Sequence, residues 1–400
     1  MMITMLKTVL IVSILLGICD GSAAAGANSP NLKSSLATIK AEICTGHFLT
    51  TKTVSASDEI QACIDMGAAV VSLPSGRIIL DRQISIKHPV TLKTAGATDG
   101  APTCTEKSES CAHLVISPNF NGSNGVLAIA STQNVNLDHI IVDGNRSNRL
   151  RTPAAALCAA GQNNYGKTIT VHGCAHCTVN ASTFQNALCG SPLEWIGDDA
   201  TIANNLFVRN GDSKKKNMWA DGLTILQAND SRIIGNTLID NSDVGLIVGG
   251  GRNLEVRNNR IQQKSVTAFA GLMLDNFNGS QSGDFKGAVI SGNKIECEKC
   301  FFAFNIGPLP WYRPAKMIFG GEVSNNEILG GTLGLNIDGV SSTSPMRIRS
   351  NRFGISTPAT KVRCRSGKVI TSTRFSVSAE SSLTPDSNVP QIVQSTAGCI

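Results

Sequence analysis

A short phrase recurs along this chain: an Asn two residues before an apolar residue, with a Gly-apolar-apolar run about a dozen residues upstream. The copies are spaced by 31, 23, 34, 33 and 25 residues, which indicates a unit of about 23 residues with loops inserted in some copies. A unit this short cannot hold a strand, a helix and a second strand, but it accommodates a few short strands and tight turns. The repeat therefore predicts a solenoid. Its marker residues are Asn205, Asn236, Asn259, Asn293, Asn326 and Asn351.

Each unit predicts one coil of a parallel β-helix, and we expect about ten coils in a single all-β domain. The apolar runs at 222–225 and 245–248 are typical of its strands. Asn suits the turns because it tolerates the left-handed backbone conformation, and stacked Asn side chains can hydrogen-bond from coil to coil. The composition agrees, because 38 Gly residues and many Asn, Ser and Thr leave few segments that could form an amphipathic helix.

The N-terminus is typical of a secretory signal over residues 1–25, with Lys7, an apolar run at 8–18 and small residues at 22–25. The apolar run is too short to span a membrane. We expect a secreted or periplasmic protein, with a lipid anchor at Cys19 as the alternative.

The rest of the chain divides into three predicted parts. Residues 26–95 are expected to form an N-terminal segment and cap, 96–355 the β-helix, and 356–400 a Ser- and Thr-rich tail or second cap. Residues 58–64 have the pattern of a short amphipathic helix. A helix ahead of the first strands suits a cap over the open apolar end of a solenoid.

The cysteines favour disulfides. Loss of Cys19 with the signal leaves 12 of the 13 cysteines, an even number that suits an oxidising compartment. We expect Cys364 and Cys399 to staple the tail. The CxxC pairs at 174/177 and 297/300 raise the alternative of a zinc site, which their wide separation and the export signal disfavour. We therefore predict neither a metal nor a cofactor.

The net charge of +6 favours an acidic polysaccharide or a negatively charged cell surface as the partner of an exported protein. Lys214-Lys215-Lys216 is the densest basic run, and its alternative interpretation is a solvated loop tip. We expect no nucleic-acid partner, no membrane span and a monomer.

Asp221 and Asp243 are the strongest candidates for chemistry. They are 22 residues apart, so they should lie at nearly the same point on consecutive coils, which stack about 4.8 Å apart. Two carboxylates held that close can divide their pKa values into an acid and a base, as glycoside hydrolysis requires. The alternative is that both merely cap turns. Asp198 and Asp199 match the position of a turn in the next coil.

The helix, strands and Asn-marked coils resemble the right-handed parallel β-helix of the pectin lyase-like superfamily, which includes pectate lyases, polygalacturonases and polysaccharide epimerases. Asp221-Gly222, followed one coil later by Ser242-Asp243, resembles the polygalacturonase pattern Asn-Thr-Asp-Gly followed by Asp-Asp. The Gly-His-Gly of that family appears as Phe269-Ala270-Gly271, without His, and no Arg-Ile-Lys follows. The resemblance implies a carbohydrate-active, polygalacturonase-like relative that acts on another glycan.

Aromatic and basic residues could wall a cleft beside this pair. Trp219 lies two residues before Asp221, and a later inserted loop carries the remaining candidates. Aromatic faces stack on sugar rings, and Arg or Lys pairs with uronate or sulfate groups. The alternative is a packing loop. The substrate-binding candidates are Trp219, Trp311, Tyr312, Arg313 and Lys316.

Three functions fit these features. The first is a glycoside hydrolase that cleaves an acidic polysaccharide through Asp221 and Asp243 without a cofactor. The second is a polysaccharide lyase or epimerase acting on a polyuronide, with Arg313 or Lys316 as the base and Ca²⁺ or basic side chains neutralising the uronate. The third is a non-enzymatic glycan-binding or surface structural protein.

Overall fold

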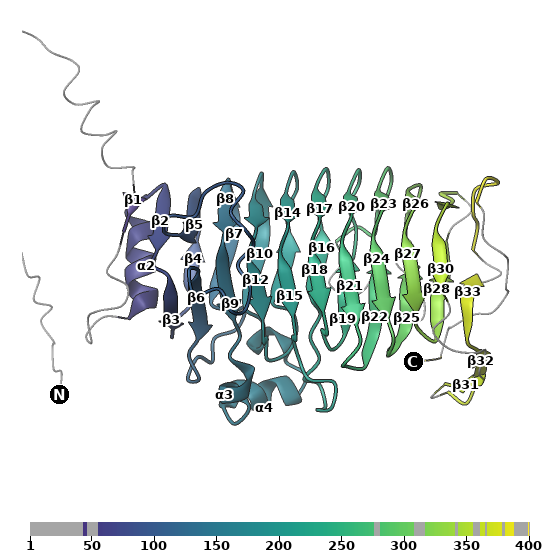
Figure 1. Ribbon diagram of the computed structural model, residues 1–400, viewed down its shortest axis with the longest axis horizontal. Helices are drawn as coiled ribbons and strands as arrows, with labels where there is room; N and C mark the ends of the chain where they lie inside the picture. The colour runs from purple at the N-terminus through teal and green to yellow at the C-terminus, as the bar shows by residue number, and fades with distance from the viewer. Residues whose placement is uncertain are drawn as a thin grey trace, which may run out of the picture. The chain divides into compact units, whose positions relative to one another are not determined.

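The computed structural model describes residues 43–45, 55–275, 281–307, 317–340, 343–354, 361–364, 366–377, 381–387 and 399. The predicted signal peptide lies outside the described residues. The described strands form three parallel sheets of eleven, ten and ten strands, here called A, B and C, and one antiparallel pair. Each coil contributes one strand to each sheet in the order A, B, C, and the coils stack side by side (Figure 1). The all-β solenoid of about ten coils is confirmed.

The bounds of the strands follow the coils. Sheet A contains β1 (Ile43–Cys44), β2 (Val70–Leu73), β5 (Val90–Thr94), β8 (Val135–Asp138), β11 (Thr178–Asn180), β14 (Thr201–Ala203), β17 (Arg232–Ile234), β20 (Glu255–Arg257), β23 (Val289–Ser291), β26 (Glu322–Ser324) and β29 (Arg347–Arg349). Sheet B contains β3 (Gly76–Leu80), β6 (Ala112–Ile116), β9 (Ile140–Asp143), β12 (Thr183–Gln185), β15 (Leu206–Val208), β18 (Thr237–Ile239), β21 (Arg260–Gln263), β24 (Lys294–Cys297), β27 (Glu327–Gly330) and β30 (Arg352–Gly354). Sheet C contains β4 (Ile84–Ile86), β7 (Leu127–Gln133), β10 (Ile169–Ala175), β13 (Leu193–Ile196), β16 (Leu223–Gln227), β19 (Val244–Val248), β22 (Ala268–Leu274), β25 (Cys300–Ile306), β28 (Leu333–Ile337) and β33 (Thr373–Val377).

The core lies inside the coils and is built from columns of apolar side chains. Strands alternate inward and outward residues, so each coil places one apolar side chain above that of the coil before it. In sheet A the column is in register and fully buried, and it consists of Ile233, Val256, Ile290, Val323 and Ile348. A core repeated in this way makes the register of each coil depend on its neighbours.

The marker asparagines form the predicted ladder. The Asn236 Oδ1 atom accepts hydrogen bonds from the backbone N–H and the Nδ2 group of Asn205, both at 3.0 Å. The Nδ2 group of Asn236 in turn donates to Asn259 Oδ1 at 3.0 Å and to the carbonyl oxygen of Ile202 at 2.9 Å. The same pattern continues through Asn351. These side chains therefore satisfy buried polar groups at each turn from sheet A to sheet B between β14 and β30.

The left-handed conformation expected for the marker asparagines belongs to the residue before each of them. Asn204, Gly235 and Asn258 have φ values of 56°, 66° and 56°, whereas the marker residues that follow them are absent from the positive-φ positions. The turn needs a left-handed residue to reverse the chain and then a side chain that can bridge coils. The sequence-based prediction gave both the left-handed conformation and the bridging hydrogen bonds to the marker asparagine, whereas in the fold the residue before it is left-handed and the asparagine itself bridges the coils.

Helix α2 (Ala56–Asp65) covers the N-terminal end of the coils, as predicted. The Ser55 side chain caps the helix by accepting from the N–H of Ser57 at 3.2 Å, and Ile60 and Ile64 are buried. Gln61 accepts from the N–H of Ser85 on edge strand β4 at 2.7 Å and donates to its carbonyl at 3.0 Å. The helix thus covers the apolar end and satisfies part of an exposed strand edge.

The β-helix extends beyond the boundaries that the sequence indicated. Strands β2 to β5, within the predicted cap segment, already belong to the three sheets, and β33, within the predicted tail, pairs with β28 in sheet C. An antiparallel hairpin of β31 (Lys361–Arg363) and β32 (Val369–Thr371) packs near Ile247 and Met273 outside sheet C. The disulfide between Cys364 and Cys399 staples this tail, as expected.

Short helices interrupt the first coils. Helices α3 (Arg146–Arg149) and α4 (Pro153–Ala159) and the 3₁₀ turn η1 (Asn163–Tyr165) lie between β9 and β10. None of the described helices is long and apolar enough to cross a membrane.

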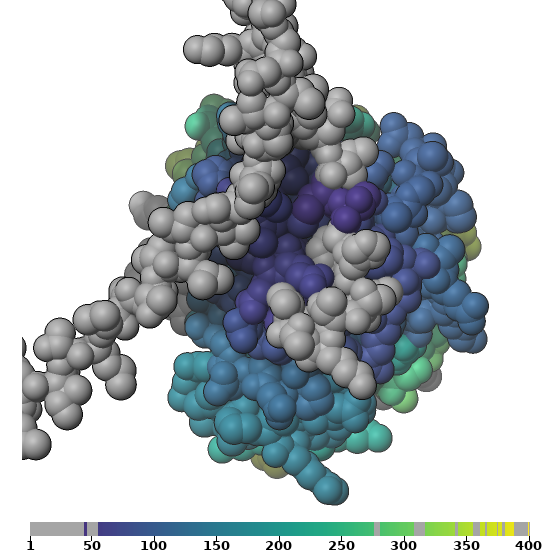
Figure 2. Space-filling model, turned by 90° about the vertical axis from the view of Figure 1, so that its left-hand side faces the viewer, coloured from purple at the N-terminus to yellow at the C-terminus, as the bar shows by residue number. Residues whose placement is uncertain are grey.

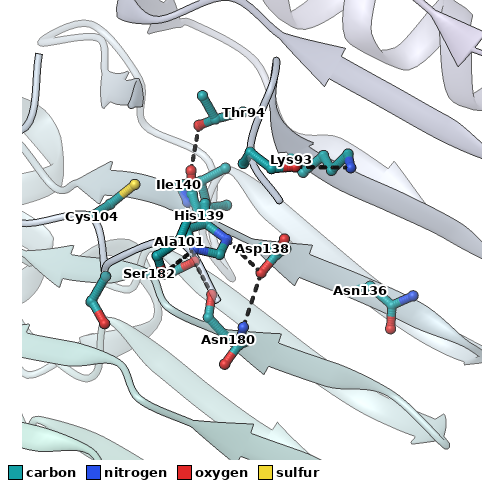
Figure 3. Close-up of polar contacts among 12 residues, drawn as sticks. Lys93, Thr94, Ala101, Cys104, Asn136, Asp138, His139, Ile140, Asn180 and Ser182 are labelled. Carbon is teal, nitrogen blue, oxygen red and sulfur yellow. Dashed lines mark hydrogen bonds and ion pairs between the residues drawn. The ribbon is translucent and has the colours of Figure 1, made fainter. Parts of the chain in front are cut away.

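A buried histidine fastens the 95–111 loop to the turn between β8 and β9. Figure 3 shows His139 between the Asp138 carboxylate and the Ala101 carbonyl, with its ring nitrogens 2.9 Å and 3.0 Å from their oxygens. His139 is 3% exposed and has a φ of 49°. The Asp138 carboxylate also accepts from the Asn180 side chain at 3.1 Å, which links the turn to the next coil.

Replacing His139 with alanine should lower the free energy of unfolding by about 1–3 kcal/mol, because two polar groups lose their partner in a buried turn. Urea unfolding followed by circular dichroism measures the change. His139→Asn is the matched control, since asparagine tolerates the left-handed backbone and separates backbone strain from lost hydrogen bonds. An unchanged urea midpoint for His139→Ala would show that the contacts contribute nothing to stability.

Candidate functional site

Asp221 and Asp243 lie on consecutive coils, each at the entrance to a strand of sheet C. The register pairs Leu223 with Leu246, so Gly222 lies opposite Gly245 and the two carboxylates are offset by one residue. By this register Asp243 takes the first position of the acidic pair in the polygalacturonase pattern. The structure brings the two side chains together, as the 22-residue spacing indicated.

Close approach of the coils explains the glycines that follow these carboxylates. A Cβ atom on Gly222 would lie 2.4 Å from the carbonyl oxygen of Gly245, and one on Gly245 would lie 2.5 Å from that of Gly271. Any larger residue would push the coils apart at this point. The Asp-Gly sequence therefore couples an acidic side chain to a position where neighbouring backbones nearly touch.

Hydrogen bonds hold the Asp221 side chain in place. Its Oδ2 atom accepts from the Thr224 hydroxyl at 2.6 Å and from the Ser191 hydroxyl at 3.4 Å. Its Oδ1 atom accepts from the N–H of Val244 at 3.2 Å. No described residue hydrogen-bonds to the Asp243 carboxylate, and both Asp residues are only half-buried. One carboxyl group is thus fixed, while the other is available to an incoming molecule.

The surroundings raise the pKa of both groups. Burial, followed by repulsion from Asp243, raises the pKa of Asp221 to about 8 against the opposing hydrogen bonds. Burial raises the pKa of Asp243 to about 6. Because the two neighbouring charges disfavour each other, the groups titrate as a pair, and the pair keeps a proton to a higher pH than two isolated carboxyl groups would. A protonated and an ionised carboxyl group side by side can act as general acid and general base.

A second charged cluster, which the sequence did not reveal, lies one coil earlier on the outer face of sheet C. Glu194 is the strand neighbour of Thr224, the residue that holds Asp221. Its carboxylate binds Lys167 Nζ at 2.6 Å and His172 Nε2 at 3.2 Å. Burial alone would raise the pKa of Glu194, but the hydrogen bonds and charges of His172 and Lys167 lower it. Glu194 is therefore ionised and paired.

The predicted aromatic and basic wall is only partly within the described structure. The Trp219 side chain is 43% exposed, and its carbonyl oxygen accepts from the N–H of Gly190 at 2.8 Å, beside Asp221. Trp195, in contrast, is buried in the core and cannot stack on a sugar. The other predicted binding residues, Trp311, Tyr312, Arg313 and Lys316, lie outside the described residues.

Phe269, one residue before the position at which the polygalacturonase pattern has its histidine, joins the next coil to Asp243 through its backbone. The N–H of Phe269 donates to the carbonyl oxygen of Asp243 at 2.7 Å. Its ring stacks on that of Phe301, with ring centroids 6.4 Å apart. The position that aligns with the histidine of the family pattern is Ala270, which has no ionisable side chain.

The remaining candidates for metal binding and acid chemistry have structural roles. Both CxxC pairs form disulfides, so their sulfur atoms are not zinc ligands. Within the described ranges, no three His, Cys, Asp or Glu side chains converge in a way that could hold a metal ion. Asp198 accepts from the N–H of Asn229 at 2.8 Å, and Asp199 has a φ of 51°, so both belong to a turn between sheets C and A.

Comparison with known proteins agrees with this architecture. A family model described as "Right handed beta helix region" matches residues 159–305. The endo-xylogalacturonan hydrolase from Aspergillus tubingensis superposes with a TM-score of 0.55 at 11% identity, over 88% of this chain and 99% of that one. The fold is a right-handed parallel β-helix.

Other proteins share this β-helix. The A-module of the mannuronan C-5 epimerase AlgE6 from Azotobacter vinelandii has a TM-score of 0.52 at 13% identity, over 84% of this chain and 86% of that one. A mutant tailspike protein of Escherichia coli bacteriophage HK620, in complex with a hexasaccharide, has a TM-score of 0.51 at 11% identity, over 86% of this chain and 60% of that one. A search of curated protein sequences finds no match. Likeness at these identities extends to the fold alone.

Proposed function

We propose that this protein is a glycoside hydrolase that cleaves an acidic polysaccharide. The observation that carries the proposal is the pair of adjacent carboxyl groups on consecutive coils, both with a raised pKa. Asp221 donates its proton to the glycosidic oxygen as the bond to the leaving sugar breaks. Asp243 acts at the anomeric carbon, either as the base that activates a water molecule or as the carboxylate that attacks the carbon directly.

An acidic substrate is supported by charge and by the proteins that share the fold. The chain carries a net charge of +6, which attracts polyanions. Two of its structural neighbours are a hydrolase of xylogalacturonan and an epimerase of mannuronan. Exposed Trp219 offers a stacking face next to the pair. Secretion or export to the periplasm would bring the protein to a polysaccharide outside the cell. Six disulfides favour such an oxidising compartment.

Incubation of the purified protein with polygalacturonate, alginate and other acidic polysaccharides tests the proposal. A hydrolase releases new reducing ends without the ultraviolet absorbance of an unsaturated uronate. Reducing ends that appear together with that absorbance would identify a lyase, for which Arg313 and Lys316 are the candidate bases. Retention of the glycan on the protein without new reducing ends would identify a binding protein.

The rate of cleavage should follow a bell-shaped pH profile. Activity requires Asp243 to be ionised, so it rises with pH as that group loses its proton near pH 6. It also requires Asp221 to keep its proton, so activity falls as pH passes about 8. Initial rates measured at constant ionic strength from pH 4 to pH 10 check both limbs. A profile that is flat across this range would contradict the assignment of the two roles.

A further inference from the structure

A groove lies beside the candidate site, between the helical insertion of the first coils and the loop at 212–218. Helices α3 and α4 project from the stacked coils in Figure 1, and Figure 2 shows blue and teal residues bulging out below the purple cap. The groove has a volume of about 460 Å³. Buried Ala155 and Met218 contribute to its lining, together with exposed Arg151, Lys215 and Lys216.

The lining of the groove is cationic. No acidic side chain is among its lining residues, and Arg151, Lys215 and Lys216 form no ion pair with any other described residue. The nearest carboxylate in this loop, that of Asp212, accepts from the backbone N–H of Lys214 at 3.0 Å and faces Arg146. Three unpaired cations around an apolar base suit a ligand that has both carboxylate groups and apolar faces, as a chain of acidic sugars does.

The groove is firmly attached to the coils. A disulfide joins Cys158 of α4 to Cys189, and the Asn217 side chain donates to the carbonyl oxygen of Ala159 at 2.9 Å. Met218 is 3% exposed and packs in one cluster with both cysteines. The groove therefore keeps its shape without a bound ligand, which reduces the entropy that binding would cost.

Backbone hydrogen bonds of Gly190 link the wall of the groove to the segment that carries Asp221. Gly190, next to Cys189 in sequence, donates its N–H to the carbonyl oxygen of Trp219 at 2.8 Å and accepts from the N–H of Asp221 at 2.8 Å. Met218 is three residues before Asp221, so their Cα atoms are at most about 11 Å apart. Exposed Trp219 lies between the two in sequence. A glycan chain at the carboxylate pair thus has a short path into the groove.

We propose that this groove is a distal binding site for uronate residues of the polysaccharide that is cleaved at Asp221 and Asp243. The inference rests on the proposed function. Sugars bound here lie outside those that contact the carboxylate pair, so the groove selects long, acidic chains over short or neutral ones. Under this proposal the basic run at 214–216 binds substrate, whereas its alternative interpretation from the sequence was a solvated loop tip.

The test compares the parent protein with a Lys215→Gln, Lys216→Gln double variant and with Arg151→Gln. Calorimetry at low salt measures the binding of long polygalacturonate and alginate chains, of their trimers, and of neutral dextran. We expect the double variant to bind the long acidic chains about tenfold more weakly, and with less dependence on salt concentration. Binding of the trimers should be unchanged.

Arg252→Gln with Lys286→Gln is the matched control. Both residues line a groove of about 590 Å³ at the turns between sheets C and A, where Asp198 and Asp230 also lie, so their removal should leave binding unchanged. Equal affinity of parent and double variant for the long chains would overturn the proposal, as would an equal loss for chains and trimers. If the double variant binds long chains more weakly but the parent protein cleaves none of them, the groove is a glycan-binding site and the proposal of a hydrolase is wrong. If the parent protein cleaves the polysaccharide but the double variant binds long chains as tightly as the parent, the hydrolase proposal stands and the proposed role of the groove is wrong.

Discussion

Replacing either Asp221 or Asp243 with asparagine is expected to lower the rate of glycan cleavage by about 10²–10⁴-fold. Asparagine has the size of aspartate but can neither transfer a proton nor attack as a carboxylate, so each variant loses the step that its carboxyl group performs. The loss should appear mainly in kcat, because the pair acts on the bond being broken rather than on the rest of the chain. Reducing-end assays on the substrate identified for the parent protein measure it.

Asp230→Asn is the control for this pair. Asp230 lies in the coil of Asp221 but at the opposite turn, is exposed, and accepts from the Asn253 side chain at 2.8 Å. Its replacement makes the same chemical change away from the candidate site and should leave the rate within about twofold of the parent. If both Asp221→Asn and Asp243→Asn cleaved at the rate of Asp230→Asn, the two residues would be turn caps and the hydrolase assignment would be wrong.

Replacing Asn259 with alanine is expected to lower the free energy of unfolding by about 3–5 kcal/mol. Its side chain is 1% exposed. It accepts from the N–H of Asn236 at 2.9 Å and from its Nδ2 group at 3.0 Å, and it donates to Asn293 at 3.0 Å and to the carbonyl of Ile233 at 2.8 Å. Alanine removes the acceptor of the Asn236 N–H and takes one hydrogen bond each from Asn236 Nδ2, Asn293 Oδ1 and the Ile233 carbonyl oxygen. Urea unfolding followed by circular dichroism measures the loss.

Two further variants give this result its scale. Asn351 ends the ladder and is half-buried, so Asn351→Ala should cost less, about 1–2 kcal/mol. Asn258, the exposed left-handed neighbour of Asn259, has a φ of 56°, and Asn258→Gly should change stability by less than about 0.5 kcal/mol. The ladder would have no special energetic role if all three variants unfolded at the same urea concentration.

The architecture was predictable because its cause repeats along the chain. From β14 onward, buried amides at each turn from sheet A to sheet B need the same side chain in every coil, so Asn205, Asn236 and Asn259 mark the register in the sequence itself. The same spacing was enough to bring Asp221 next to Asp243. The strand β33 could not be found in this way, because the Ser- and Thr-rich tail carries no marker and is held by pairing with β28.

The rest of the site depends on contacts that no repeat records. Glu194 lies opposite Thr170 in sheet C, two residues from His172 on the same face, and Lys167 lies at the end of the connection that contains α3 and α4. The same helices bring Arg151 next to Lys215, two residues that are far apart in sequence. Insertions of this kind change which side chains meet without changing the period, so the sequence pattern does not reveal their partners.

The ladder also restricts where this protein can change in length. From β11 onward, the turn from sheet A to sheet B always has two residues, whereas the connection from sheet C to sheet A grows from 176–177 in one coil to 307–321 in another. One added residue in the first turn would shift a marker asparagine away from its neighbours, while longer loops elsewhere leave every column of the core in place. From β11 onward, new binding specificities can therefore arise by lengthening loops at two edges of the coils, while the turns from sheet A to sheet B keep a constant length.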